Sequence, residues 1–186
     1  MLYQPQIPQN TGAIGRQILG SEHAKLHLIG KLGFSLESSK VKRAGLDYWK
    51  NLEPHLHYYP GWNDFQKAVS QSKTQFGKKY WFTKKAKESL FDTQFEFQQL
   101  PSVATTPDIT MSTISLCFGS EVSGIDDIRE ELERSEDSDF FVKIPMSGSF
   151  SKSRDFTYLA EVFKCTHSFN LILTLPFCTH FIPILF

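Results

Sequence analysis

The heptad Asn10-Thr11-Gly12-Ala13-Ile14-Gly15-Arg16 combines residue types that can bind a ligand, and it follows directly after the turn-ended run Leu2–Pro8. The pattern predicts a loop that caps a helix, with Asn10 accepting hydrogen bonds from N–H groups of the first turn and Gly12 allowing a ligand close to the backbone. Arg16 would project from that first turn, where the positive helix end disfavours a cation, so we expect it to serve an anionic partner. The alternative is an ordinary capped helix with a solvated arginine.

A second candidate site follows the apolar segment Ile114–Phe118, which predicts a buried strand. Gly119 would let an adenine or a ribose pack flat against the backbone. Glu121 could accept a hydrogen bond from a ribose hydroxyl, or it could order the loop. A simple strand followed by a turn is the alternative interpretation.

A third candidate is the segment Ile144-Pro145-Met146-Ser147-Gly148. Pro145 would stop the preceding strand, which leaves backbone N–H and C=O groups available to an adenine edge. Nucleotide hydrolysis and classical dinucleotide binding are disfavoured. The loop that contains Gly119 and Gly124 lacks the lysine and hydroxyl residue of a phosphate-binding loop, and no G-x-G-x-x-G motif follows a strand.

Strand and helix patterns alternate along the chain. The predicted strands are 2–3, 25–29, 56–59, 79–83, 114–118 and 140–144, and the predicted helices are 13–22, 63–69 and 126–134. Residues 46–50 are expected to be a short helix or irregular. Residues 91–113 are expected to be a weak strand, at the alternating positions 91–97, followed by a loop. This alternation predicts an α/β fold with a mostly parallel sheet flanked by helices, in which ligands bind beyond the carboxyl ends of the strands.

Four segments in a fixed order resemble the SPOUT superfamily of knotted methyltransferases, and within it the tRNA (cytidine/uridine-34) 2'-O-methyltransferases. They are Pro8–Gly12, Arg43–Trp49, Leu116–Ile125 and Ile144–Gly148, and the resemblance spans roughly residues 1–149. It implies a SPOUT-type sheet with a C-terminal trefoil knot, a rare exception to unknotted topology. It also implies transfer of a methyl group from S-adenosylmethionine to a ribose 2'-hydroxyl of tRNA, at wobble position 34 of the anticodon stem-loop.

The same resemblance implies a homodimer. We expect no metal, because the sulfonium is already an activated electrophile, and no membrane partner. The cytoplasm is expected from the cysteine usage described below. Two other functions stay open at this point. One is a catalytically impaired or frameshifted homologue that binds RNA weakly or not at all. The other is methylation of ribosomal RNA by the same fold.

The resemblance assigns cofactor contacts to the loops that follow three strands. Carried over by position, these contacts fall on Phe82, Gly119 and Ile144. Glu121 and Met146 lie in two of the same loops, and we count both among the expected cofactor-binding residues.

Catalytic roles are implied for the first motif. Arg16 matches an arginine that assists attack by the ribose 2'-hydroxyl, by binding phosphate near the target and easing development of an alkoxide. Asn10 matches the capping asparagine of the motif, whereas Ala13 replaces a second asparagine.

The chain departs from the family after Ser149. The segment Phe150–Thr157 lacks the expected serine and asparagine, and Lys152 stands where a cofactor-contacting serine is expected. A reading-frame slip near Ser149 is one hypothesis, because codons for this segment read one base later can spell Phe-Arg-Ser-Leu-Glu-Ile-Ser. The altered residues leave knot closure, cofactor binding and dimerisation open.

We divide the chain into a methyltransferase domain, residues 1–164, and a tail, residues 165–186, that contains no Asp, Glu, Lys or Arg. We interpret this tail as a hydrophobic, poorly specified end. Proline and polar residues within it count against a membrane-spanning helix. The repeated Cys-Thr-His at 165–167 and 178–180 has the wrong internal spacing for a zinc finger.

Composition agrees with one globular domain of 186 residues, of which 40% are hydrophobic and 22% charged. The net charge is zero, so no overall basic field indicates a nucleic-acid partner, although local patches can still bind phosphate. Two basic clusters are candidates: Lys40, Lys42 and Arg43 in the first, and Lys78, Lys79, Lys84, Lys85 and Lys87 in the second. The three cysteines do not form a disulfide framework, which favours a reducing compartment.

Overall fold

The computed structural model describes residues 1–21, 24–36, 48–71, 76–96, 98–99, 112–135 and 139–144. The strands are β1 (Leu2–Tyr3), β2 (Leu26–Ile29), β3 (Leu56–Tyr59), β4 (Lys78–Phe82), β5 (Glu88–Ser89), β6 (Gln98–Gln99), β7 (Ser112–Phe118) and β8 (Asp139–Lys143). The helices are α1 (Pro8–Leu19), α3 (Trp49–Leu52), η1 (Glu53–His55), α4 (Trp62–Gln71) and α6 (Arg129–Arg134).

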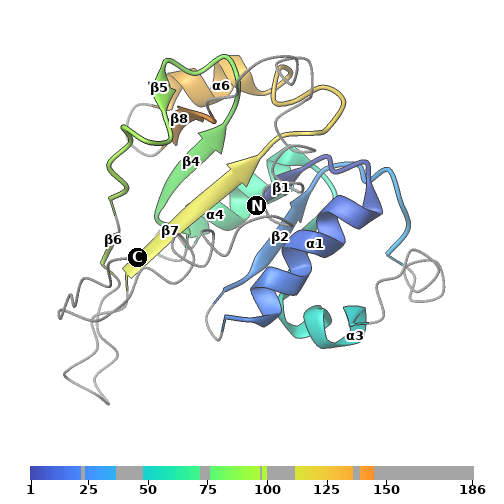
Figure 1. The fold of residues 1–186 in the computed structure, drawn as a ribbon. Coiled ribbons are helices and arrows are strands. Elements are labelled where there is room, and N and C mark those ends of the chain that lie inside the picture. The colour runs from blue at the N-terminus through green and yellow to red at the C-terminus, as the bar shows by residue number, and fades with distance from the viewer. Residues whose placement is uncertain are drawn as a thin grey trace, which may run out of the picture.

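Seven of the strands form a parallel sheet in the order β3-β2-β1-β7-β4-β8-β5, and β6 adds an antiparallel pairing to β7 (Figure 1). The chain therefore builds outward from β1 to β3, and later inserts β7 between β1 and β4. Parallel strands bring their carboxyl ends to one edge. In open α/β sheets a ligand binds at that edge, where the strand order reverses.

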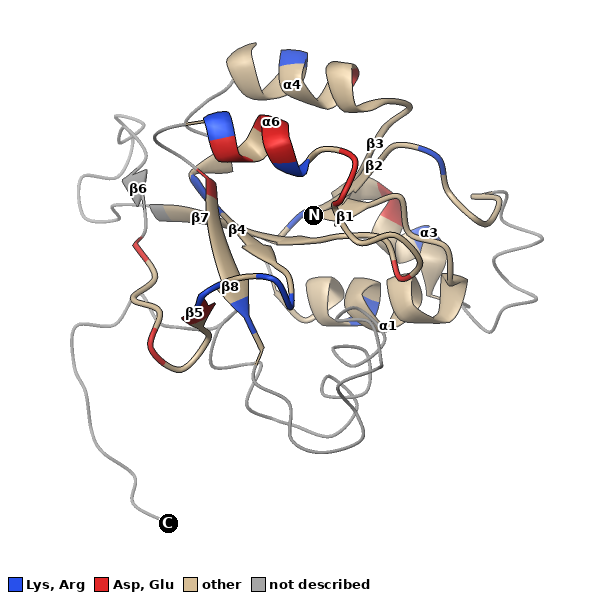
Figure 2. Cartoon of the chain, turned by 90° about the horizontal axis from the view of Figure 1, so that it is seen from above, with Lys and Arg blue, Asp and Glu red and all other residues tan. Residues whose placement is uncertain are grey.

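Helices cover both faces of the sheet. Figure 2 shows α1 and α3 on one side and α4 and α6 on the other. Successive side chains of β4 point to opposite faces of the sheet, so this strand contributes to both hydrophobic clusters. Tyr80 and Phe82 pack on the side of α1 and α3, and Trp81 packs on the side of α4 and α6. All three side chains are buried, and this central position explains why the strand reads as a nearly continuous aromatic run.

The fold class expected from the sequence is confirmed: an α/β fold with a parallel sheet flanked by helices. Several bounds differ. The first helix begins at Pro8 rather than near Ala13, because proline suits the first turn, where its missing N–H costs nothing. Residues 126–128 form a turn before α6. Residues 91–96 contain no strand, and the short strands β5 and β6 flank them. Residues 145–186, including the predicted knot and tail, lie outside the described part of the chain.

A buried histidine on β2 predicts acid sensitivity of the fold. His27 is 6% exposed, stacks on His57 at a ring distance of 4.8 Å, and places Nδ1 3.0 Å from the Tyr59 hydroxyl oxygen. Burial, followed by the charges of the N-terminal amine, His57 and Lys25, lowers the pKa of His27 to about 3. Since the unfolded residue titrates near pH 6.5, the unfolded chain binds the proton first as pH falls.

We therefore expect the neutral His27 to stabilise the fold fully above about pH 6.5, and to lose that contribution progressively towards pH 3. The loss between pH 6.5 and 5 should be about 1.5 kcal/mol of unfolding free energy. Urea unfolding at several pH values measures it, and His27→Gln should show a flatter pH dependence than the unaltered chain. His55→Gln is the control, because His55 lies outside this stack. Equal pH slopes for all three proteins would contradict the expectation.

Candidate functional site

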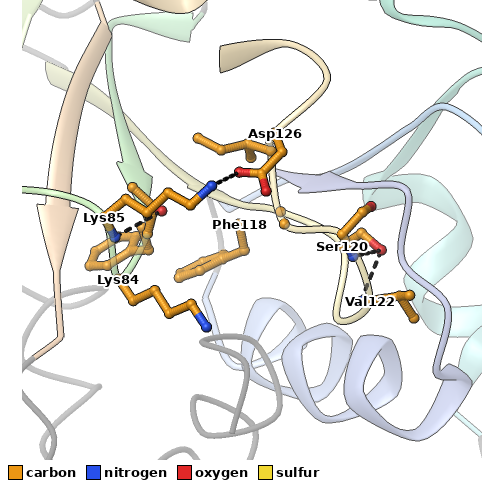
Figure 3. A pocket seen from close by; sticks show the side chains of 12 residues that line it. Lys84, Lys85, Phe118, Ser120, Val122 and Asp126 are labelled. Atoms are coloured by element: carbon orange, nitrogen blue, oxygen red, sulfur yellow. Dashed lines mark hydrogen bonds and ion pairs between the residues drawn. The ribbon is translucent and has the colours of Figure 1, made fainter. Parts of the chain in front are cut away.

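A cavity of about 350 Å³ lies at the carboxyl ends of β4 and β7 (Figure 3). Its walls come from the loops that follow these two strands, residues 82–85 on one side and 118–120 with 122–126 on the other. The size is at the lower end of the range for small-molecule sites. The predicted site residues Phe82 and Gly119, which are 37 positions apart in sequence, both line this cavity.

Two aromatic rings lie side by side at this edge of the sheet. Phe82 and Phe118 are register partners on β4 and β7, and their rings stack with centroids 4.8 Å apart and planes inclined by 17°. Both side chains are buried. The cavity therefore has an apolar, rigid side on which a flat ring can pack.

Ile144 lies beside this aromatic pair rather than in the cavity wall. It follows β8 directly and packs against the same hydrophobic cluster as Phe82 and Phe118. It does not line the cavity formed by the described residues. Of the other three expected cofactor contacts, Met146 and Lys152 lie outside the described part of the chain, and Glu121 is not among the residues that line the cavity.

Gly119 also has a structural role that the sequence did not predict. A Cβ atom built on it would lie 2.5 Å from the carbonyl carbon of Gly124 and 2.6 Å from its oxygen. The loop folds back on itself through two backbone hydrogen bonds between Ser120 and Gly124, of 2.8 and 2.9 Å. Glycine is thus required by the loop's own backbone, whatever ligand the cavity holds.

Replacing Gly119 should consequently destabilise the protein. We expect Gly119→Ala to lower the unfolding free energy by about 1–3 kcal/mol, because backbone rather than a flexible side chain must move. Urea denaturation followed by circular dichroism measures this loss. Gly61→Ala is the matched control, since the nearest atom to its Cβ is Asp64 Oδ2 at 3.4 Å. An unchanged midpoint for Gly119→Ala would show that the loop tolerates a side chain.

Glu121 lies at the centre of a hydrogen-bond network that joins two distant loops. Its carboxylate accepts hydrogen bonds from the backbone N–H groups of Gln6 (2.7 Å) and Ile7 (3.2 Å), and from Nδ2 of Asn10 (3.4 Å). The residue is 5% exposed. Of the two roles left open by the sequence, the structure shows the ordering of a loop, and the loop in question is the one that leads into α1.

The predicted cap at Asn10 is wrong. The helix starts at Pro8, two residues before Asn10, and its N-cap residue is Ile7, which makes no side-chain cap. Asn10 therefore lies inside α1, where its side chain donates a hydrogen bond to Glu121. The negative charge that a helix N-terminus prefers comes from Glu121 instead, 111 residues away from Asn10. A local capping pattern could not reveal a partner at that separation.

The position of Arg16 also differs from the prediction. Since α1 runs from Pro8 to Leu19, Arg16 lies in its last turn, where a cation is favourable, and the argument from the first turn does not hold. Its guanidinium lies over the Tyr48 ring, with Cζ 4.8 Å from the centroid, and the Tyr48 hydroxyl donates to the Gly12 carbonyl oxygen. Arg16 is exposed and does not line the cavity.

The second basic cluster divides into two environments. Lys79 is buried and pairs with Asp139 at 3.4 Å, and Lys78 pairs with Glu96, so neither belongs to an open basic surface. Three lysines of the turn after β4 are exposed: Lys84, Lys85 and Lys87. The first cluster, Lys40, Lys42 and Arg43, lies outside the described residues.

Other reactive chemistry is absent from the part of the chain that the structure describes. No group of three or more His, Cys, Asp or Glu side chains is placed to hold a metal there. Burial raises the pKa of the Cys117 thiol to about 12, so it stays protonated and unreactive at neutral pH. Over the same residues, no helix has the length and hydropathy of a membrane span.

A parallel sheet with an aromatic-sided cavity between the loops of two adjacent strands is typical of α/β proteins that bind a ligand at the strand ends. The family described as SpoU rRNA Methylase matches residues 1–153, and the chain belongs to this family.

One relative is similar over nearly the whole chain, and a second over about a third of it. A Listeria innocua protein named "Putative tRNA (cytidine(34)-2'-O)-methyltransferase" is 33% identical over 179 residues, which cover 95% of this chain and 92% of the relative. A tRNA (cytidine(34)-2'-O)-methyltransferase of Methylovorus glucosotrophus is 51% identical over 60 residues, covering 31% of this chain and 38% of the relative.

Solved structures share the fold. One, described as giving insights into the 2-OH methylation of C/U34 on tRNA, matches with a TM-score of 0.63 and 29% identity, and covers 92% of this chain and 93% of its own. AviRb of Streptomyces viridochromogenes, solved in complex with the cofactor AdoMet, matches with a TM-score of 0.59 and 18% identity over 88% of this chain and 54% of its own.

Proposed function

We propose that this protein transfers a methyl group from S-adenosylmethionine to the 2'-hydroxyl of the ribose at position 34 of tRNA. The observation that carries the proposal is the cavity at the carboxyl ends of β4 and β7. The similarity to proteins named tRNA (cytidine(34)-2'-O)-methyltransferases supports the substrate. The structure described for C/U34 methylation, which matches over nearly the full length of both chains, supports the same choice.

The residues present fit the cofactor. A cavity of about 350 Å³ beside two stacked phenylalanines suits a nucleoside, because the base can pack on an apolar surface while backbone groups of the loops bind its polar edge. We propose that Phe82 and Gly119, which line the cavity, hold the cofactor, that Ile144 supports them from beside the aromatic pair, and that Met146 and Lys152 complete the site. When bound, the sulfonium supplies an activated methyl group.

Within this proposal the protein contributes position and charge. Arg16 binds the RNA phosphate near the target ribose and favours the developing alkoxide on the 2'-oxygen. Asn10 and Glu121 act by holding the loop that leads into α1, through the hydrogen bonds already described. We further propose a homodimer in the cytoplasm, and a division into a methyltransferase domain, residues 1–164, and a tail, residues 165–186. Sedimentation of the full chain tests the dimer.

Two measurements on the full chain test the proposed function. Calorimetry with S-adenosylmethionine should show one site per chain. Mass mapping of tRNA from a deletion strain should show loss of a ribose methyl group at position 34 and no loss from ribosomal RNA. Folded protein, as judged by circular dichroism, that gives no heat with the cofactor would instead support a catalytically impaired homologue.

A further inference from the structure

The turn that follows β4 carries three exposed lysines, and two of them, Lys84 and Lys85, line the cavity. Its buried residues are Thr83 and Ala86, and the Ala86 N–H donates to the Thr83 carbonyl oxygen at 3.1 Å. The lysines of this turn are exposed: Lys84 and Lys85 lie between the two buried residues, and Lys87 follows them. Because the buried residues and this hydrogen bond fix the backbone, the lysines present their charges at a defined place.

One of these lysines reaches across to the opposite wall. Nζ of Lys85 lies 2.6 Å from Oδ1 of Asp126, so the pair connects the loop after β4 with the loop after β7 (Figure 3). The side chains are 51% and 58% exposed, which places the pair at the open side of the cavity. Asp126 is held there by its neighbour Ile125, which is 2% exposed.

We propose that Lys85 binds a backbone phosphate of the RNA substrate, and that Asp126 competes with that phosphate for the same ammonium group. The inference rests on the proposed function. An ion pair as exposed as this one is weak, so a phosphate that brings its own negative charge can replace the carboxylate. RNA binding then opens the link between the two walls.

The occupant is an extended polyanion rather than a single nucleotide. Lys87 is exposed on the same turn but does not line the cavity, so the row of cations continues from the rim onto the outer surface. A nucleoside inside the cavity cannot contact it. A nucleic-acid strand whose target ribose enters the cavity places neighbouring phosphates along this turn, where each lysine contact adds sequence-independent affinity.

A double-mutant cycle tests the competition. Binding of a labelled anticodon stem-loop is measured by fluorescence anisotropy at several salt concentrations, without cofactor, for the full chain and for Lys85→Ala, Asp126→Asn and the double variant. We expect Lys85→Ala to weaken binding about fivefold and to reduce the slope of log affinity against log salt by about one. Asp126→Asn should strengthen binding about two- to fivefold, and only when Lys85 is present.

The control is Lys67→Ala, an exposed lysine on α4 that does not line the cavity, which should leave binding unchanged. An equal gain from Asp126→Asn with and without Lys85 would show simple repulsion of RNA by Asp126, and would overturn the competition. An unaltered salt slope in Lys85→Ala would overturn the phosphate contact. If the unaltered chain binds both the cofactor and the stem-loop, either of these two results overturns the Lys85 inference and leaves the proposed function intact. If the unaltered chain binds neither, the proposed function is overturned as well.

Discussion

Arg16→Ala should lower the turnover of tRNA methylation by about 10²- to 10³-fold while changing the affinity for S-adenosylmethionine by less than about threefold. The guanidinium is exposed on the last turn of α1, lies over Tyr48 and makes no wall of the cavity, so its removal takes nothing from the proposed cofactor site. We propose that it stabilises only the negative charge that develops on the 2'-oxygen in the transition state. Single-turnover methylation of an anticodon stem-loop, with calorimetry for the cofactor, measures the two quantities separately.

Two further variants sharpen this test. Arg16→Lys keeps the charge but not the planar fork, and should give an intermediate rate. Arg134→Ala removes an exposed arginine that pairs with Glu130 on α6, and should change neither quantity. Equal losses of turnover and of cofactor affinity in Arg16→Ala would contradict the proposed role.

Lys79→Met should lower the free energy of unfolding by about 3 kcal/mol or more. The Lys79 and Asp139 side chains are only 7% and 4% exposed, and their charged atoms lie 3.4 Å apart across the neighbouring strands β4 and β8. Removing the cation leaves the buried carboxylate with two neutral donors among the described residues, Trp81 Nε1 at 2.8 Å and the Ser135 hydroxyl at 2.8 Å. An uncompensated buried charge is the expensive case. Urea unfolding at pH 7 measures the loss.

The adjacent residue on the same strand provides the control. Lys78 pairs with Glu96, whose side chain is 66% exposed, so Lys78→Met should cost less than about 1 kcal/mol. The double variant Lys79→Met with Asp139→Asn should recover part of the lost stability, because no charge is then left buried. Similar losses for Lys78→Met and Lys79→Met would show that burial does not set the cost.

Local patterns in the sequence were sufficient to predict the positions of most strands of the sheet. The strands around 26–29, 56–59, 78–82, 112–118 and 139–143 each carry alternating or continuous apolar side chains, and the burial of β2 and β4 on both faces is what makes those patterns visible. Their order could not be predicted in this way, because nothing local to β7 indicates that it enters between β1 and β4.

The candidate site was predicted unevenly for the same physical reason. Phe82 and Gly119 could be assigned to strand ends, and strand ends converge in a parallel sheet. The partners of Asn10 and Lys79 could not be predicted from the sequence. Glu121 contacts Asn10 from 111 positions later, and Asp139 contacts Lys79 from 60 positions later, only in the folded chain. The aromatic setting of Arg16 depends on Tyr48, which lies 32 positions away.

The insertion of β7 has a consequence for how the chain folds during synthesis. Until residue 118 has left the ribosome, β1 has a neighbour on only one side, and until residue 121 has followed, the N–H groups of Gln6 and Ile7 lack the Glu121 carboxylate that binds them. Contacts of such long sequence separation form slowly, since a large loop must close first. The loop that leads into the helix of the first motif thus acquires its final shape only after the third segment, Leu116–Ile125, has been made, and a nascent N-terminal fragment would carry an exposed strand edge in the meantime.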